Sequence, residues 1–364
     1  MKVLIFTVTV GVGHNEVSKN IAEKFKEKGD EVLIHNLFEN HRFYNWVLSK
    51  LGFQAMMKLP KIANFFYDNS KRKNKQLYEN MIKSVKEKTL KVVNDFDPDV
   101  IISAHIAGLD FVKTYEGLFK KQVLNYFVIT DYDIPPGLKD FRKNEYIVIP
   151  NADFKNELIE KGLNEERLLP FGIPINKKYY IEISRQQALD KLNIELDEDK
   201  RVVLITGGGV GLGHSFKLIK ELSKHEDLQI ISVAGKNKKL KENVDNLSNK
   251  SRARIISFGF TKELEYIMTL TDVIVGKTGG ITATEAIVKR VPFIAMKNTP
   301  KPEHANLLYF IDKKIAVGID HVKNAYNIIK NIDKEKIKEK IENEFPKQDS
   351  CELIYKHIKE TLKK

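Results

Sequence analysis

A histidine follows a glycine-containing turn at the end of the first apolar run of the sequence. Lys2–Val8 reads as a strand buried on both faces, and Gly11-Val12-Gly13-His14 comes directly after it. Open α/β sheets bind ligands beyond the carboxyl ends of their strands, which is where His14 would stand. An imidazole, with an ordinary pKa of about 6.5, can take a proton from a hydroxyl near neutral pH. His14 is therefore the candidate general base; the alternative is a histidine that only caps the next helix.

A second glycine-rich turn opens the second half of the chain. The strand-like Arg201–Thr206 runs into a loop that contains Gly207, Gly208, Gly209 and Gly211. Glycines at a strand-to-helix turn let backbone N–H groups approach a phosphate. The loop lacks the Gly-Lys-Ser/Thr of a Walker A motif, and the alternative interpretation is a tight turn that requires small residues.

The stretch Lys277–Ala286 is a second candidate for phosphate binding. Gly279 and Gly280 would open a helix after the strand Asp272–Gly276 and present free N–H groups to an anion. Glu285, about a turn into that helix, can accept hydrogen bonds from a ribose diol. Two such turns and an acid predict a site for a nucleotide diphosphate.

Three further polar groups extend these candidates. Glu303 and Asn306, in a loop that runs into a helix, can hydrogen-bond sugar hydroxyls, unless they belong to an ordinary helix start. Asp131-Tyr132-Asp133 has the spacing of a divalent-cation site, but helix termini and Lys277 can neutralise a diphosphate without a metal. We therefore expect no metal at Asp131 and Asp133.

The elements that position these residues alternate between strands and helices. Strands are expected at Glu31–Leu37, Val100–Ser103, Gln122–Thr130, Tyr146–Pro150, Leu228–Ala234, Ala253–Phe258 and Phe293–Met296, and one helical stretch at Lys334–Lys363. Two arrays that each open with a glycine turn predict an α/β fold of two facing Rossmann-like domains. We place the N-terminal domain at 1–172, the C-terminal domain at 173–345 and a final helix, packing back on the first domain, at 346–364.

Charge is concentrated in one segment that breaks this alternation. The chain carries a formal net charge of +12, and residues 41–75 contain one acid, Asp68, against eight basic residues: Arg42, Lys50, Lys58, Lys61, Lys71, Arg72, Lys73 and Lys75. Seven aromatic residues, among them Trp46, are interleaved with these charges. The pattern is typical of an interfacial membrane segment. Core packing and nucleic-acid binding are the alternatives.

The cysteine count and the apolar runs limit the kind of protein that this chain can be. Cys351 is the only cysteine, which excludes internal disulfides and fits a reducing compartment. No apolar run approaches the roughly 18–20 residues of a membrane-spanning helix, and the N-terminus lacks the pattern of a signal peptide. We therefore expect a cytoplasmic protein, bound peripherally to the inner face of the cell membrane.

The chain resembles the GT-B glycosyltransferases of the monogalactosyldiacylglycerol synthase and processive diacylglycerol glucosyltransferase group, which are related to MurG. The resemblance spans nearly the whole chain. It is carried by Gly11-Val12-Gly13-His14, Gly207-Gly208-Gly209 with Gly211 and Gly213, Gly259-Phe260, Lys277–Ala286, and Glu303 with Asn306.

This resemblance implies roles for the candidate residues, with the active site in the cleft between the domains. The C-terminal domain would hold a UDP-sugar: Phe260 at uracil, Gly279, Gly280 and Thr282 at the diphosphate, Glu285 at the ribose, and Glu303 and Asn306 at the sugar. The N-terminal domain would hold the acceptor near His14, Gly13, His105, Asp131 and Trp46. Relatives tend to carry a His and a Trp shortly after the Thr-Asp pair, whereas this chain continues Thr130-Asp131-Tyr132-Asp133-Ile134-Pro135. The departure leaves the identity of the acceptor open.

The predicted function is inverting transfer of a hexose from a UDP-hexose to a lipid such as diacylglycerol, with no cofactor required. The sequence leaves the sugar and the oligomeric state open. The alternatives are a MurG-type UDP-N-acetylglucosamine transferase, a UDP-sugar epimerase and, from another class, a basic nucleic-acid-binding protein. We expect no nucleic-acid partner, because nucleic-acid binding would leave the two predicted phosphate-binding turns of the second half unexplained.

Overall fold

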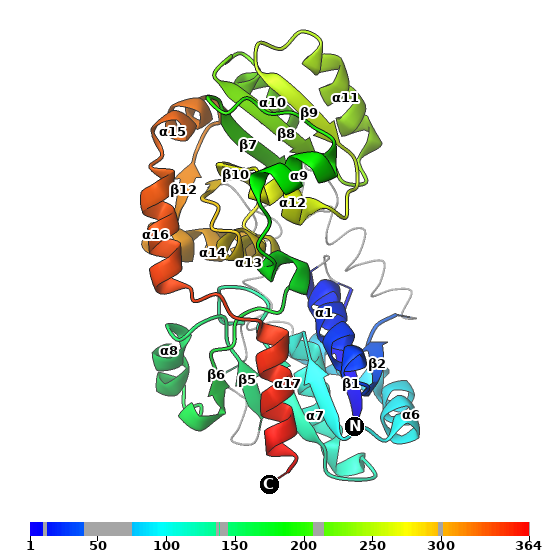
Figure 1. Cartoon of the computed structure of the whole chain (residues 1–364). Coiled ribbons are helices and arrows are strands. Elements are labelled where there is room, and N and C mark those ends of the chain that lie inside the picture. Colours follow the sequence, from blue (N-terminus) through cyan, green and yellow to red (C-terminus); the bar gives the residue numbers. More distant parts are fainter. Residues whose placement is uncertain are drawn as a thin grey trace. The chain divides into compact units, whose positions relative to one another are not determined.

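The computed structural model describes residues 1–9, 13–39, 75–135, 138, 145–206, 215–297 and 301–363. Contacts divide the chain into two compact units (Figure 1). Unit 1 comprises Met1–Asn176 together with Gln348–Lys364, and unit 2 comprises Lys177–Lys347. In the described parts of the chain, no helix is long and apolar enough to cross a membrane.

Unit 1 contains a six-stranded parallel sheet in the order β2-β1-β3-β4-β5-β6. Its strands read as short apolar runs because helices cover both faces of a parallel sheet. The central strand β3 is buried along its whole length, and β1 along all but its first residue. The strands are β1 Lys2–Thr7, β2 Glu31–Asn36, β3 Val100–Ser103, β4 Leu124–Val128, β5 Tyr146–Val148 and β6 Leu168–Leu169.

The helices of unit 1 cover this sheet. Leu4, Phe6 and Ile101 form a core cluster with residues of α5, α6 and α7. These alternating strand positions point to one face, which α5–α7 therefore cover. The helices are α1 Gly13–Glu27, α5 Lys75–Ser84, α6 Lys86–Phe96, α7 Ile106–Tyr115, α8 Phe154–Glu160 and α17 Ser350–Thr361.

The last helix, α17, packs beside α1 although the two lie at opposite ends of the sequence (Figure 1). Lys24 Nζ contacts Asp349 Oδ2 at 2.9 Å, and the rings of Phe25 and Tyr355 meet edge to face. Gly172 has a φ of +87°, and a Cβ there would stand 2.8 Å from Ser350 Oγ. Glycine is therefore required where the chain passes the start of α17.

Unit 2 repeats the architecture with the strand order β12-β11-β10-β7-β8-β9, again all parallel. The strands are β7 Arg201–Thr206, β8 Leu228–Val233, β9 Arg254–Phe258, β10 Val273–Gly276, β11 Phe293–Met296 and β12 Ala316–Ile319. The helices are α9 Arg185–Leu192, α10 Ser215–Leu222, α11 Lys238–Ser248, α12 Leu264–Thr269, α13 Gly280–Val288, α14 Lys301–Asp312, α15 Ala325–Asn331 and α16 Lys334–Glu344.

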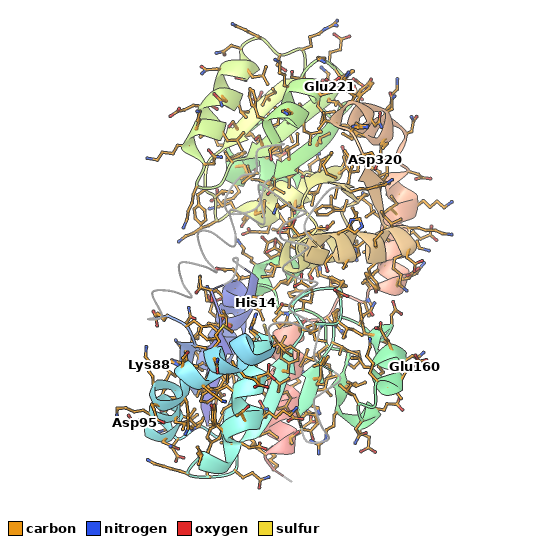
Figure 2. All side chains as sticks on the ribbon, turned by 180° about the vertical axis from the view of Figure 1, so that it is seen from behind. His14, Lys88, Asp95, Glu160, Glu221 and Asp320 are labelled. Atoms are coloured by element: carbon orange, nitrogen blue, oxygen red, sulfur yellow. The ribbon has the colours of Figure 1, made fainter. Side chains whose placement is uncertain are left out.

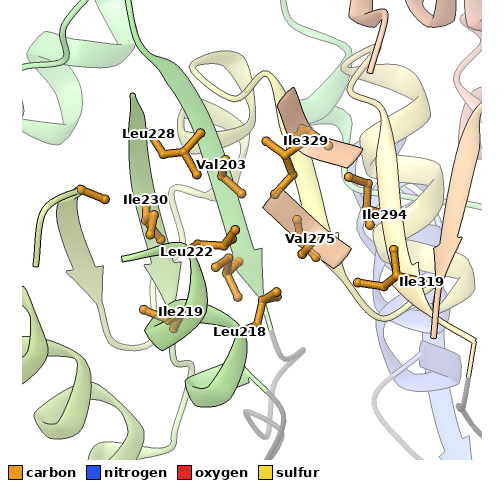
Figure 3. Packing of buried hydrophobic residues seen from close by; sticks show 14 of the residues in the cluster. Val203, Leu218, Ile219, Leu222, Leu228, Ile230, Val275, Ile294, Ile319 and Ile329 are labelled. Atoms are coloured by element: carbon orange, nitrogen blue, oxygen red, sulfur yellow. The ribbon is translucent and has the colours of Figure 1, made fainter. Parts of the chain in front are cut away.

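Aliphatic side chains fill one face of the unit 2 sheet (Figure 3). Val203 and Val275 from the two central strands pack with Ile219 and Leu222 of α10 and with Ile329 of α15. Burying each such side chain contributes about 1.5–3 kcal/mol. The packing fixes the strand ends, and with them the turns that follow.

Two parallel-sheet units confirm the predicted α/β fold, with differences in detail. The short strands β6 and β12 were not predicted. The expected helical stretch Lys334–Lys363 is interrupted: α16 ends at Glu344, and α17 begins at Ser350, within the final helix that was expected at 346–364. Pro346 lies in this gap and disfavours helical backbone at Phe345, the residue before it.

Candidate functional site

His14 lies at the point of unit 1 where the strand order reverses. From β1 the chain goes to β2 on one side, and then to β3 and the remaining strands on the other. Ligands in open parallel sheets bind in the crevice beyond the carboxyl ends of the strands at such a point. His14 stands in the first turn of α1 (Figure 2), and His105 follows the adjacent strand β3. The topology thus brings together two histidines far apart in sequence.

Hydrogen bonds fix the tautomer of His14. Its Nδ1 lies 2.8 Å from the carbonyl oxygen of Ala104 and 3.1 Å from Oγ1 of Thr130. A carbonyl only accepts, so Nδ1 carries the hydrogen, and Nε2 of the neutral ring carries the lone pair. His14 is part-buried, and burial lowers its pKa below the ordinary 6.5, against the opposing effect of the Ala104 carbonyl. A neutral imidazole with a lone pair on Nε2 is the form that a general base needs.

His105 contacts His14 edge to face. The ring centroids are 4.8 Å apart and the ring planes make an angle of 88°. His105 caps α7, because its Nδ1 accepts from the backbone N–H of Ala107 at 3.1 Å. Burial holds the pKa of His105 well below 6.5, and the nearby charge of His14 lowers it further. Both rings are therefore neutral near pH 7.

The other acceptor-side candidates lie around these rings or outside the described residues. Gly13 is the first residue of α1, and Asp131 is part-buried and directly follows Thr130. Asp133 Oδ1 accepts from the N–H of Ile134 at 3.0 Å. Among the residues that the structure describes, no group of three His, Cys, Asp or Glu side chains could hold a metal ion. Trp46 and the basic, aromatic segment lie outside them, apart from Lys75 at the start of α5.

Unit 2 reverses its strand order between β7 and β10, which sit side by side at the centre of the sheet. Gly276 ends β10 at this point, and a Cβ there would lie 2.6 Å from the carbonyl oxygen of Thr206 on β7. Glycine therefore allows the two strand ends to approach closely. The loop after β7, with Gly207, Gly208, Gly209 and Gly211, lies outside the described residues.

The loop after β10 is tied to the first turn of α14. Lys277 Nζ lies 2.7 Å from Glu303 Oε1, and both side chains are about four-fifths buried, with 18% and 21% exposed. Thr278 Oγ1 donates to the carbonyl oxygen of Glu303 at 2.6 Å. The side-chain amide of Asn306, fully buried, donates to the carbonyl oxygen of Thr278 at 2.7 Å. These bonds therefore hold the loop firmly against the start of α14, with the ammonium of Lys277 and the carboxylate of Glu303 side by side.

Helix α13 begins at the same loop. Gly279 is its N-cap residue, with φ −68° and ψ 142°, and among the described residues beyond its chain neighbours no atom lies within 4 Å of the place where its Cβ would be. The first turn of the helix has backbone N–H groups without partners inside the helix, which is the arrangement that binds anions. Thr282 and Glu285 are three residues apart and share the part-buried face of α13, whereas Ala283 and Ala286 face the core.

Phe260 lies two residues beyond β9, with 63% of its surface exposed. In unit 2 the structure thus brings Lys277, Gly279, Gly280 and Glu303 together. Asn306 is in the same cluster, but it is fully buried and holds the loop. The sequence interpretation missed the Ala104 carbonyl, the Thr130 hydroxyl and the Thr278 hydroxyl. Thr130 carried a usable signal, because it directly precedes the acidic pair at the end of a predicted strand.

Two family models match the chain. Residues 14–175 match Monogalactosyldiacylglycerol (MGDG) synthase, and residues 202–361 match the glycosyltransferase family 28 C-terminal domain. The processive diacylglycerol beta-glucosyltransferase of Bacillus pumilus (strain SAFR-032) is 26% identical over 370 residues, which cover 99% of this chain and 93% of that protein. The resemblance to this group is thereby confirmed.

Solved structures share the fold. The crystal structure of Acinetobacter baumannii MurG superposes with a TM-score of 0.64 at 11% identity, covering 99% of each chain. The UDP-GlcNAc 2-epimerase of Neisseria meningitidis, bound to UDP-GlcNAc, gives a TM-score of 0.57 at 16% identity and covers 99% of this chain and 100% of that one. At such low identity the likeness shows the fold alone, which is the GT-B arrangement of two Rossmann-like domains.

Proposed function

We propose that this glycosyltransferase, in which an MGDG synthase domain precedes a family 28 C-terminal domain, transfers glucose from UDP-glucose to a hydroxyl of diacylglycerol. The relative that matches almost the whole chain is a diacylglycerol glucosyltransferase, which supports this choice of sugar and acceptor. The observation that carries the proposal is the His14 ring, held at Nδ1 by Ala104 and Thr130, at the strand-order reversal of unit 1.

His14 would act as the base. Its Nε2 accepts the proton of the acceptor hydroxyl, and the acceptor oxygen forms a bond to the anomeric carbon of glucose. The bond between that carbon and the diphosphate breaks, and UDP leaves with the electron pair. Because a single displacement attacks the carbon opposite the leaving group, the anomeric configuration inverts. The α-linked glucose of UDP-glucose would thus become a β-glucoside.

Unit 2 would bind the donor. The N–H groups at the start of α13 and the ammonium of Lys277 would neutralise the diphosphate, without a metal or other cofactor. Thr282 and Glu285 lie on the part-buried face of the same helix, with the Glu285 carboxylate assigned to the ribose hydroxyls.

Glu303 would bind hydroxyls of the sugar. Its carboxylate already contacts Lys277, so a phosphate that engages the ammonium brings the attached sugar within reach of Glu303. Asn306 and Thr278 would set the position of this pair through their bonds to the loop backbone. Sugar selection is thereby assigned to the first turn of α14.

The test is incubation of the purified protein with diacylglycerol and, one at a time, UDP-glucose, UDP-galactose and UDP-N-acetylglucosamine, followed by mass spectrometry of the lipids. We expect glucosyl-diacylglycerol and an equal amount of UDP, with a β-anomeric proton in the NMR spectrum of the product. Rates should be unchanged by EDTA. Transfer of N-acetylglucosamine only, or conversion of a UDP-sugar without any acceptor, would instead support a MurG-type transferase or an epimerase.

The lipid acceptor also suggests where the protein works. A diacylglycerol is insoluble in water, so the acceptor-binding unit must meet a lipid surface. We propose peripheral binding to the anionic inner face of the cell membrane through residues 41–75, on the basis of their charge and aromatic content.

A further inference from the structure

The contact between His14 and His105 is built by the sheet. Strands β1 and β3 pair in parallel, with Phe6 opposite Ser103, so the residues that follow the two strands emerge next to each other. The ring of His105 then meets the ring of His14 at 88°, with centroids 4.8 Å apart. His105 thus limits how the His14 ring can turn about its side-chain bonds.

The backbone next to His105 holds the same ring from a second side. The N–H of Ala104 donates to the carbonyl oxygen of Phe6 at 2.9 Å, and the carbonyl of Ala104 accepts from His14 Nδ1 at 2.8 Å. His105 itself is fixed at φ −144° and ψ 146° by its cap bond to Ala107. Residues 104–105 therefore provide both a hydrogen-bond acceptor for His14 and an aromatic ring that packs against it.

We propose that His105 is a positioning residue for His14: its ring holds the imidazole of His14 in the orientation in which Nδ1–H meets the Ala104 carbonyl, which leaves the lone pair on Nε2. The inference rests on the proposed function, because it gives His14 the role of base. His105 exchanges no proton with the substrate; it acts only through His14.

The electrostatics of the pair agree with this role. When His14 takes up a proton, a positive charge forms 4.8 Å from the centre of the His105 ring. His105 is neutral at that moment, because burial and the charge of His14 both lower its pKa. Two adjacent imidazolium ions, which would repel each other, therefore do not form during turnover.

The decisive variant is His105→Asn. Asparagine is a good N-cap, so its side-chain oxygen can keep the bond to the Ala107 N–H while the ring is lost. We expect kcat to fall about 10–100-fold, since a misplaced catalytic group can cost roughly 10²-fold, with the KM for UDP-glucose within about twofold of wild type. The matched control is His321→Asn, at a histidine that precedes a short helix in unit 2 with a similar backbone, φ −134° and ψ 139°. Wild-type kcat in a folded His105→Asn protein would overturn the proposal.

A double variant separates positioning from direct catalysis. In a His14→Ala background, His105→Asn should change the residual kcat less than twofold, because the residue through which it acts is gone. If the two losses multiply instead, His105 acts on the substrate itself and the positioning role is wrong.

A measurement without turnover separates this inference from the proposed function. Nitrogen-15 NMR of the imidazoles should show hydrogen on Nδ1 of His14 in the wild type and a mixture of tautomers in His105→Asn. An unchanged tautomer in the variant would overturn the positioning role. A change of tautomer in a protein that transfers no glucose would keep the positioning role and remove the proposed function.

Discussion

Lys277 and Glu303 form a largely buried ion pair, with Nζ and Oε1 2.7 Å apart, in the loop where unit 2 would receive a diphosphate and a sugar. The ammonium attracts phosphate, whereas the carboxylate repels it. The pair therefore favours a ligand that brings both an anion and a set of hydroxyl donors.

Glu303→Gln tests this division of roles. Without the carboxylate, UDP alone should bind equally or several-fold more tightly, because a repulsive charge is removed. Turnover of UDP-glucose should fall at least tenfold, because a charge-assisted bond to the sugar is lost, worth about 1.5–3 kcal/mol. Calorimetry and steady-state kinetics measure the two effects. The control is Lys297→Gln, which breaks an exposed ion pair with Asp320. Tenfold weaker UDP binding by Glu303→Gln would contradict the assignment of Glu303 to the sugar.

Glu285→Ala should weaken UDP binding about 10–100-fold. A carboxylate that accepts from two ribose hydroxyls makes charge-assisted bonds of about 1.5–3 kcal/mol, and each 1.4 kcal/mol is roughly tenfold in affinity. Calorimetry with UDP measures the loss, and Glu342→Ala, which removes an exposed partner of Arg290 in the same unit, is the control. Unchanged affinity in a folded Glu285→Ala protein would remove this residue from the donor site.

His14→Ala should lower kcat about 10²–10⁴-fold, the range for loss of a general base. Affinity for UDP should stay within about twofold, because the residues proposed to bind UDP belong to unit 2. In the wild type, burial lowers the pKa of His14, so the base stays unprotonated below the ordinary value of 6.5. We therefore expect the acidic limb of the kcat/KM profile to lie below pH 6.5, and a limb above 6.5 would argue against His14.

Stability should decrease in acid because of buried histidines. His35 is buried against the Phe6 ring with Nε2 3.2 Å from Oγ1 of Thr89, and burial together with the charge of Lys88 lowers its pKa below 6.5. The unfolded chain, in which the pKa is ordinary, then binds more protons than the folded one. The contribution to stability is full above pH 6.5 and is lost as the pH falls through the lower, folded-state pKa.

Thermal unfolding between pH 7.5 and 5.5 measures this effect. Each excess proton bound by the unfolded chain lowers the free energy of unfolding by at most about 1.4 kcal/mol per pH unit. His35→Gln, which cannot take up a proton, should show a shallower dependence on pH than wild type. Parallel curves for the two proteins would assign the acid sensitivity to other groups.

Binding to vesicles should require anionic lipid. Each basic residue near an anionic surface contributes about 1 kcal/mol, and screening shortens to about 8 Å at physiological ionic strength. Replacing Lys71, Arg72, Lys73 and Lys75 by glutamine should therefore reduce co-sedimentation with anionic vesicles and leave UDP affinity unchanged. Equal sedimentation with neutral and anionic vesicles, for both proteins, would exclude electrostatic docking.

The sequence points to single residues of the candidate site more readily than to their partners. His14 could be found because a glycine turn after an apolar strand is a local pattern. Its acceptor Ala104 could not, because that contact depends on β1 pairing with β3, which no local pattern encodes. Any residue type offers a backbone carbonyl, so the alanine carries no signal.

The prediction of strands and helices is limited in the same way, because some of them depend on contacts between distant parts of the chain. Long apolar strands were recognisable, whereas the two-residue β6 is defined only by its pairing with β5. The charged pattern of 334–363 predicted helix throughout, whereas Pro346 is the local sign of the break between α16 and α17. In unit 2, Asn306 has a residue type that can bind a sugar, but its burial against the Thr278 carbonyl is a tertiary property.

The docking of α17 on α1 has a consequence for synthesis. The partners of Lys24 in this contact lie 325 and 328 positions later in the sequence. Unit 2 is one uninterrupted stretch of sequence, so all of its residues are made before residues 348–364 of unit 1 are translated. Unit 1 begins first, but the contacts that α1 makes with α17 can form only after residues 349–361 have been made. The N-terminal unit is therefore completed last, although its first strand is made first.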